Sequence, residues 1–81
     1  MGQSRELKNL MNRINPEKLL HSKWTSKLPL NREKHFIVTA LFRNEECRVT
    51  GCELQAVINE KSYRINWTEL ENHQQWLFGW Q

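Results

Sequence analysis

The segment HFIVTALF, residues 35–42, changes the pattern of the sequence from helical to extended. Its apolar side chains alternate, and they occupy both faces of the strand that this alternation predicts. One face would carry Phe36, Val38, Ala40 and Phe42, and the other Ile37 and Leu41. A strand with apolar side chains on both faces needs cover on both sides, so it should not stand uncovered at the edge of a sheet.

Two more strands are predicted after this segment. A polar turn, RNEE at residues 43–46, leads to a strand whose apolar set begins at Cys47 and Val49 and moves to Cys52, Leu54 and Ala56. Because the switch from odd to even positions falls at Gly51, we expect a β-bulge there. After a turn at residues 59–60, a third strand sends Tyr63, Ile65 and Trp67 to one face and Ser62, Arg64 and Asn66 to the other.

Before residue 35 the pattern is helical. Leu7, Leu10, Met11 and Ile14 form one stripe of a helix that begins near Ser4. Asn15-Pro16 ends this helix and caps a second, short one, PEKLLHSKW at residues 16–24, which places Leu20 and Trp24 on one side. Residues 25–34, with Pro29 and Asn31, read as a connecting loop. Downstream, Thr68 and Glu71 have the spacing of a capping box, which predicts a helical turn to about residue 73.

These elements predict an α+β fold. It would contain a small, strongly bent antiparallel sheet of three main strands, which could curl like a barrel, with an N-terminal helix and a Trp-rich closing segment. The N-terminal amphipathic helix covers residues 1–14, and the Trp-rich α+β domain covers residues 15–81. The closing segment, WLFGW at residues 76–80, would either pack on one face of the sheet or pair alongside residues 35–42. We expect Trp76 and Trp80 to fill the open side, with Gly79 permitting a close turn.

The composition limits the classes of function. The chain has 81 residues, a net charge of +3 and four tryptophans. Residues 1–34 carry eight Lys and Arg against three Glu, so the basic character lies in the first half. This imbalance favours an anionic partner, but solvated lysines on a surface give the same bias. A chain of this length buries little apolar surface, so most of its indoles should belong to the core.

Several classes of site are not expected. Cys47 and Cys52 are four residues apart in C-x4-C spacing, without the second Cys or His pair of a zinc finger, so no metal or other cofactor is predicted. Neither thiol is marked as activated, and no phosphate loop can be built from three glycines, so we expect no enzyme. No signal peptide or membrane-spanning run is present, and we expect a cytoplasmic protein without membrane contact.

The combination of SKWT (residues 22–25), REKHF (residues 32–36) and the closing W…GW (residues 76–80) resembles a family of small tryptophan-rich proteins from proteobacteria and cyanobacteria. The resemblance covers roughly residues 15–81. The family is uncharacterised, so it implies a self-contained bacterial domain and supplies no catalytic residues.

The most specific functional hypothesis is noncatalytic binding of single-stranded RNA or DNA. The basic segment carries cations on both sides of an indole, so that phosphates and a stacked base could be held together. The predicted contacts are Lys23, Lys27, Arg32, Lys34 and Arg64 for phosphate and Trp24 for stacking. The alternatives are that Trp24 packs beside Leu20 in the core, or that the N-terminal apolar stripe binds a protein partner or a second copy of the chain.

Overall fold

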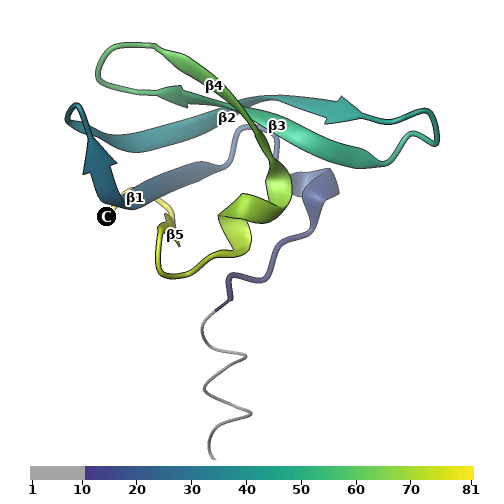
Figure 1. Ribbon diagram of the computed structural model, residues 1–81, viewed down its shortest axis with the longest axis horizontal. Helices are drawn as coiled ribbons and strands as arrows, with labels where there is room; N and C mark the ends of the chain where they lie inside the picture. Colours follow the sequence, from purple (N-terminus) through teal and green to yellow (C-terminus); the bar gives the residue numbers. More distant parts are fainter. Residues whose placement is uncertain (1–10) are drawn as a thin grey trace, which may run out of the picture.

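A computed structural model describes residues 11–81 and shows one antiparallel sheet of five strands (Figure 1). The strands are β1 (Lys23–Leu30), β2 (Glu33–Arg43), β3 (Val49–Ala56), β4 (Ser62–Asn66) and β5 (Trp76–Phe78). They lie side by side in the order β4-β3-β2-β1-β5. Two short 3-10 turns, η1 (Pro16–Lys18) and η2 (Trp67–Glu71), lie below the arch formed by β2, β3 and β4.

The predicted α+β class is wrong, because the described chain is almost entirely sheet and contains no helix beyond η1 and η2. Residues 1–10 of the predicted N-terminal helix lie outside the described residues. Met11 forms an isolated bridge with Asn72, and the backbone N–H of Asn12 donates to the carbonyl of Glu71 at 2.9 Å. The Asn12 side chain also donates to the carbonyls of Leu70 and Trp76. Residues 11–14 are therefore held outside a helix by bonds to the C-terminal part of the chain.

The second predicted helix and the predicted loop are also wrong in extent. The cap is confirmed, because the Asn15 side chain accepts the N–H of Glu17 at the start of η1, but η1 ends at Lys18. Trp24 lies in β1, which occupies most of the segment predicted as a loop. Asn31 and Arg32 have φ values of 56° and 66°, which suit the tight turn between β1 and β2.

The three predicted strands are present as β2, β3 and β4, and the bulge at Gly51 is confirmed. The pairs Phe42–Gly51 and Arg43–Val49 flank it, so one residue of β3 is extra. A second irregularity in β2, between Val38 and Ala40, was not predicted. It turns Leu41 toward Cys52 and the core and moves Phe42 to the opposite face, so the strict alternation predicted for residues 35–42 fails after Val38.

The core lies on the face of the sheet that carries Trp24, which is fully buried. Trp24 is opposite Phe36 on β2 and Phe78 on β5, and its ring stacks on that of Phe78 with centroids 4.1 Å apart. The other core residues are Leu19, Val38, Cys52, Leu54, Ala56, Leu70 and Trp76. The closing segment thus pairs with β1, and β1 in turn covers the edge of β2.

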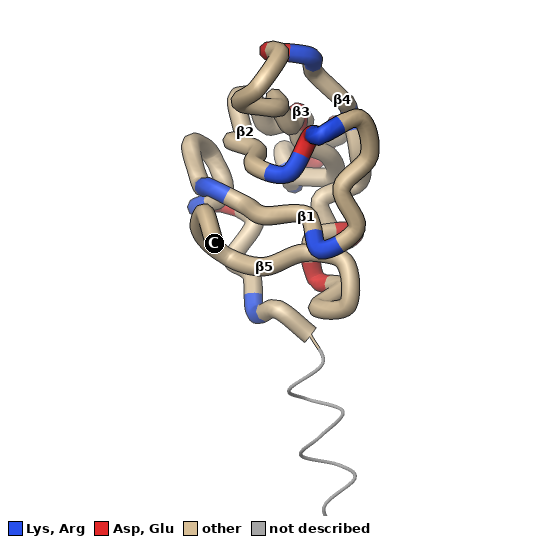
Figure 2. The backbone as a smooth tube through the Cα atoms, turned by 90° about the vertical axis from the view of Figure 1, so that its left-hand side faces the viewer, with Lys and Arg blue, Asp and Glu red and all other residues tan. Residues whose placement is uncertain are grey.

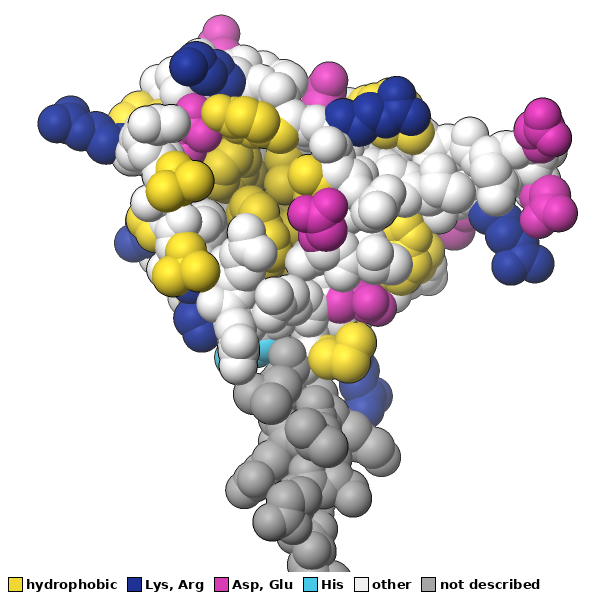
Figure 3. Space-filling view, viewed as in Figure 1, with side chains coloured by type: hydrophobic (Ala, Val, Ile, Leu, Met, Phe, Trp, Pro, Cys, Tyr) yellow, Lys and Arg dark blue, Asp and Glu magenta, His cyan; other side chains and the backbone are white. Residues whose placement is uncertain are grey.

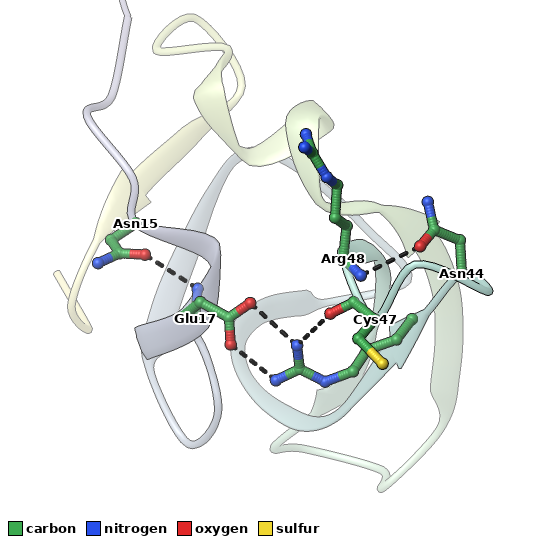
Figure 4. A network of polar contacts seen from close by, with 6 residues as sticks. Asn15, Glu17, Asn44, Cys47 and Arg48 are labelled. Carbon is green, nitrogen blue, oxygen red and sulfur yellow. Dashed lines mark hydrogen bonds and ion pairs between the residues drawn. The ribbon is translucent and has the colours of Figure 1, made fainter.

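A polar network joins η1 to the far ends of β2 and β3 (Figure 4). Arg43 donates both terminal nitrogens to the Glu17 carboxylate at 2.7 and 2.9 Å and also donates to the carbonyl of Cys47. This bidentate pair lowers the pKa of Glu17 and raises that of Arg43. Cys47 is exposed with a φ of 66°, so its predicted place in a strand is wrong.

A buried carboxylate joins β2 to β4 at the end of β2 opposite Arg43. Glu33 accepts hydrogen bonds from Asn59 at 2.6 Å and from the Tyr63 hydroxyl at 2.7 and 2.8 Å. These donors favour the charged form, so they lower the pKa of Glu33 below its usual value near 4.5. The same interaction raises the pKa of Tyr63. Glu33 therefore connects the start of β2 to β4 and to the turn before it.

The close approach of β3 to β4 predicts the effect of a substitution at Gly51. A Cβ atom there would lie 2.9 Å from the backbone oxygen of Ile65, which cannot move without shifting β4. We expect Gly51→Ala to lower the free energy of unfolding by about 1–3 kcal/mol, measured by urea denaturation. Ser62→Ala, at an exposed position of the same strand pair, should change it by less than about 0.5 kcal/mol. Equal stability of the two variants would contradict this account of the β3–β4 contact.

The Glu33 hydrogen bonds predict a dependence of stability on pH. The pKa of Glu33 is lower in the folded protein than in the unfolded chain. Its contribution to stability is therefore complete above the pKa of the unfolded chain and is lost as the pH falls through the pKa of the folded protein. We expect the midpoint temperature of thermal unfolding to fall as the pH is lowered below about 4.5. In Glu33→Gln the midpoint temperature should fall less steeply with pH. Glu45→Gln, in an exposed turn, should keep the wild-type slope, and parallel slopes for all three proteins would refute the assignment.

Candidate nucleic-acid interface

The second face of the sheet differs from the core face because most of its side chains stay half-buried or exposed. We call it the open face. Strand register places on it Lys23 of β1, His35, Ile37 and Phe42 of β2, Glu53 and Gln55 of β3, and Arg64 of β4. Alternation along strands explains the arrangement, since each neighbour of a core residue points the other way. The sheet therefore presents a surface with polar, cationic and aromatic groups at known strand positions.

Trp80 reaches this open face although Trp76, four residues earlier, is in the core. The chain reverses at Gly79, whose φ of 74° suits glycine. The N–H of Gly79 donates to the carbonyl of Lys23 at 2.7 Å, and the N–H of Gln81 donates to the Thr25 hydroxyl at 2.8 Å. The last residues thus lie across β1, and they carry the indole from one face of the sheet to the other.

The ring of Trp80 is held in place but remains 45% exposed. Its Nε1–H donates to the carbonyl of Phe36 at 3.0 Å, which fixes the orientation of the indole. The Lys23 ammonium lies 4.7 Å from the ring centroid, and the imidazole of His35 lies 6.0 Å away at a tilt of 45°. His35 is itself within 2.9 Å of the Gln81 carbonyl. An oriented, partly exposed indole with a cation beside it has the features of a stacking platform.

A second cation and aromatic pair lies on the same face. The Arg64 guanidinium carbon is 3.9 Å from the centroid of the Phe42 ring. Arg64 is also opposite Glu53 of β3, whose carboxylate accepts the Thr39 hydroxyl at 2.7 Å. The prediction that Arg64 lies on the polar side of its strand is confirmed by this register. The face therefore carries cations on β1 and β4, on opposite sides of β2 and β3.

The remaining predicted cations gather at one end of the sheet. Lys27 belongs to β1, Arg32 to the turn and Lys34 to the start of β2, and all three are exposed. Figure 2 shows the cations of β1 and of the connection between β1 and β2 on the end of the molecule that faces the viewer. The ammonium of Lys27 is 3.4 Å from the carbonyl of His73, at the edge of hydrogen-bonding distance.

The stacking role predicted for Trp24 is wrong, because the side chain is fully buried. Its Nε1–H donates to the Ser22 hydroxyl at 2.9 Å, and its ring is covered by Phe78. The alternative, that Trp24 belongs to the core, is confirmed, but its partners are Phe36 and Phe78 of the neighbouring strands and Leu20 is 44% exposed. Trp80 and His35 were not predicted to lie together on the open face, and the signal available for Trp80 was the glycine before it.

Other chemistry is limited in the described part of the chain. Burial raises the pKa of the Cys52 thiol to about 11, so the thiol is protonated at neutral pH. Within residues 11–81, no group of three or more His, Cys, Asp or Glu side chains could hold a metal ion. No helix in the same range is long and apolar enough to cross a membrane.

Comparison with known proteins places the chain in one family. No curated protein and no solved structure matches it. A family model described as Tryptophan-rich protein (DUF2389) matches residues 22–81, which is more than half of the chain and includes all five strands. The resemblance to small tryptophan-rich proteins is thereby confirmed, and the chain belongs to the Tryptophan-rich protein (DUF2389) family.

Proposed function

We propose that this protein is a noncatalytic module that binds single-stranded RNA or DNA on the open face of its sheet. The observation that carries the proposal is the half-exposed indole of Trp80 beside Lys23 and His35. Trp80 takes the stacking role first assigned to Trp24. Aromatic side chains on an exposed sheet surface are a recurring means of stacking unpaired bases.

The interaction energies favour replacement of the contact between Lys23 and the Trp80 ring by a stacked base. A cation beside an exposed aromatic ring contributes about 0.5–1 kcal/mol, whereas a base stacked on such a ring contributes about 1–3 kcal/mol. Lys23 can therefore leave the ring when a base arrives and pair with the phosphate of the same nucleotide. A duplex offers its bases already stacked and paired, so this exchange favours single strands.

The distribution of cations supports a backbone path across the sheet. Lys23 on β1 and Arg64 on β4 are three strands apart, which corresponds to about 14 Å at the usual strand spacing. Lys27, Arg32 and Lys34 extend the positive surface around the hairpin end. Each phosphate neutralised on a single strand should contribute about −0.7 to the slope of log affinity against log salt. Three or four contacts would then give a slope of about −2 to −3.

The alternative that the N-terminal stripe binds a protein partner has less support. Leu7 and Leu10 lie outside the described residues. Ile14 packs against the core, and Met11 is in an isolated bridge, so neither continues a helical stripe. A partner that recognised the predicted helix would find its last turn already used by the domain.

A titration tests the proposal. Fluorescein-labelled dT12 and rU12 should bind the full-length protein at low salt, as measured by fluorescence anisotropy, and weaken as salt rises. Trp80→Ala should weaken binding by about fivefold or more because a stacked base is lost. Lys23→Gln should weaken binding and make the salt slope less negative by about 0.7 because a phosphate contact is lost. Circular dichroism at the same concentrations verifies that the variants are folded.

The matched control is Arg48→Gln. Arg48 lies in the turn between β2 and β3, at the other end of these strands, and its side chain is 81% exposed. The Arg48→Gln substitution removes the same unit of charge as Lys23→Gln but lies away from the proposed path of the nucleic-acid backbone. An equal loss of affinity in Arg48→Gln and Lys23→Gln would reject the site, and no binding at low salt would reject the function.

A further inference from the structure

A hollow of about 220 Å³ opens on the core face of the sheet, away from the open face. Figure 3 shows apolar side chains gathered in and around it. Phe36 and Leu54 come from the central strands, Leu28 and Leu30 from β1, and Tyr63 and Ile65 from β4. Trp76, Gln75 and Glu69 close the remaining side, and Ser26 and Glu33 complete the lining. The bend of the sheet brings β1 and β4 to opposite walls, and the core does not fill the space between them.

The rim of the hollow carries two exposed leucines. Leu28 is 67% exposed and Leu30 is 76% exposed, although both line the same space as buried core residues. Single exposed leucines are ordinary, but apolar residues that continue from a rim into a recessed floor mark a contact surface. An apolar group placed in the hollow would bury both leucines at once.

The charges of the lining are all of one sign. Glu33 and Glu69 are its acidic groups, and the lining contains no Lys, Arg or His. Glu33 is 95% buried, and within residues 11–81 its carboxylate forms hydrogen bonds but no ion pair. Glu69 is exposed on η2 and also forms no ion pair with the described residues. The hollow is therefore complementary to an apolar group that has a positive charge beside it.

The volume limits the size of the occupant. Pockets for small ligands usually measure about 300–1,000 Å³, so a space of about 220 Å³ suits one or two side chains. Side chains that enter a recess of this kind commonly anchor protein interfaces. The occupant is thus better described as a residue of a partner protein than as a cofactor.

The adjoining backbone disfavours addition of a strand on the β1 side. The N–H of Leu28 already donates to the Ser26 hydroxyl at 3.2 Å, and Pro29 has no N–H. Pairing between β1 and β5 ends at Ser26, so the edge beyond it offers few donors to a new strand. Recognition on this side must therefore use side chains, which places the selectivity in the hollow.

We propose that this hollow docks a segment of a partner protein in which a bulky apolar side chain is flanked by Lys or Arg. The apolar side chain packs between Leu28, Leu30 and the floor of the hollow. A flanking cation pairs with Glu69 at the rim and is also attracted by the negative charge of Glu33. The hollow lies on the face of the sheet opposite Trp80, and its occupation does not depend on nucleic-acid binding.

Nuclear magnetic resonance of the full-length, ¹⁵N-labelled protein tests this proposal, because the Trp76 indole lines the hollow and gives its own Nε1–H signal. The probes are three capped pentapeptides, Gly-Lys-Leu-Lys-Gly, Gly-Lys-Ala-Lys-Gly and Gly-Glu-Leu-Glu-Gly. The Lys-Leu-Lys peptide should shift the Trp76 signal in a saturable way at millimolar concentration. The other two should bind about tenfold more weakly, since one lacks the buried carbons and the other has the wrong charge.

Two exposed positions supply the variants. Leu28→Ser should weaken the Lys-Leu-Lys peptide severalfold, and Glu69→Gln should weaken it while reducing its preference over Glu-Leu-Glu. Ser62→Ala, on β4 outside the lining, is the control. Equal shifts with all three peptides, no shift of Trp76, or tighter binding of Glu-Leu-Glu would overturn the proposal. Addition of dT12 should move the Trp80 signal and leave that of Trp76 in place, so the two sites can fail separately.

Discussion

The burial of the Trp24 indole is the constraint on which the rest of the sheet depends. The ring lies on β1 between Phe36 and Phe78, and a ring of this size contributes about 150–250 Å² of buried surface. Its polar edge still needs a partner, which is the Ser22 hydroxyl, and Ser22 in turn donates to the carbonyl of Leu19. One side chain thus explains why β5 pairs with β1 and why the chain before β1 folds back under the sheet.

The central strands could be predicted from sequence because their apolar pattern is dense and their turns are polar. β1 could not, because its outer residues, Leu28 to Leu30, are exposed and include a proline, which gives the composition of a loop. At residues 11–14, the described part of the predicted N-terminal helix, Asn12 bonds to three backbone groups of the C-terminal part, and those long-range bonds outweigh the local helical preference. The bulge after Val38 leaves no trace in composition, whereas the one at Gly51 does.

The candidate interface was predictable in its cations and not in its aromatic ring. Lys23 and Trp24 are adjacent in sequence, but adjacent residues of a strand face opposite sides, so the cation is at the surface and the indole is in the core. In the closing segment, Trp76 and Trp80 would share a face if the strand were regular, but they lie on opposite faces of the sheet. The positive φ of Gly79 breaks that regularity and delivers Trp80 to the side where Lys23 already lies.

The core covers only one face of this sheet. The few residues of the domain must therefore both shield the aromatic rings of the open face and fill the bend on the core face. On the open face, cations laid over Trp80 and Phe42 shield the rings from water with side chains that can be displaced. On the core face, the filling stops before the bend between β1 and β4 is closed, and it leaves acidic groups at the unfilled end. The two proposals assign an anionic chain to the open face and a basic apolar segment to the hollow, in keeping with the different charges that the two surfaces carry.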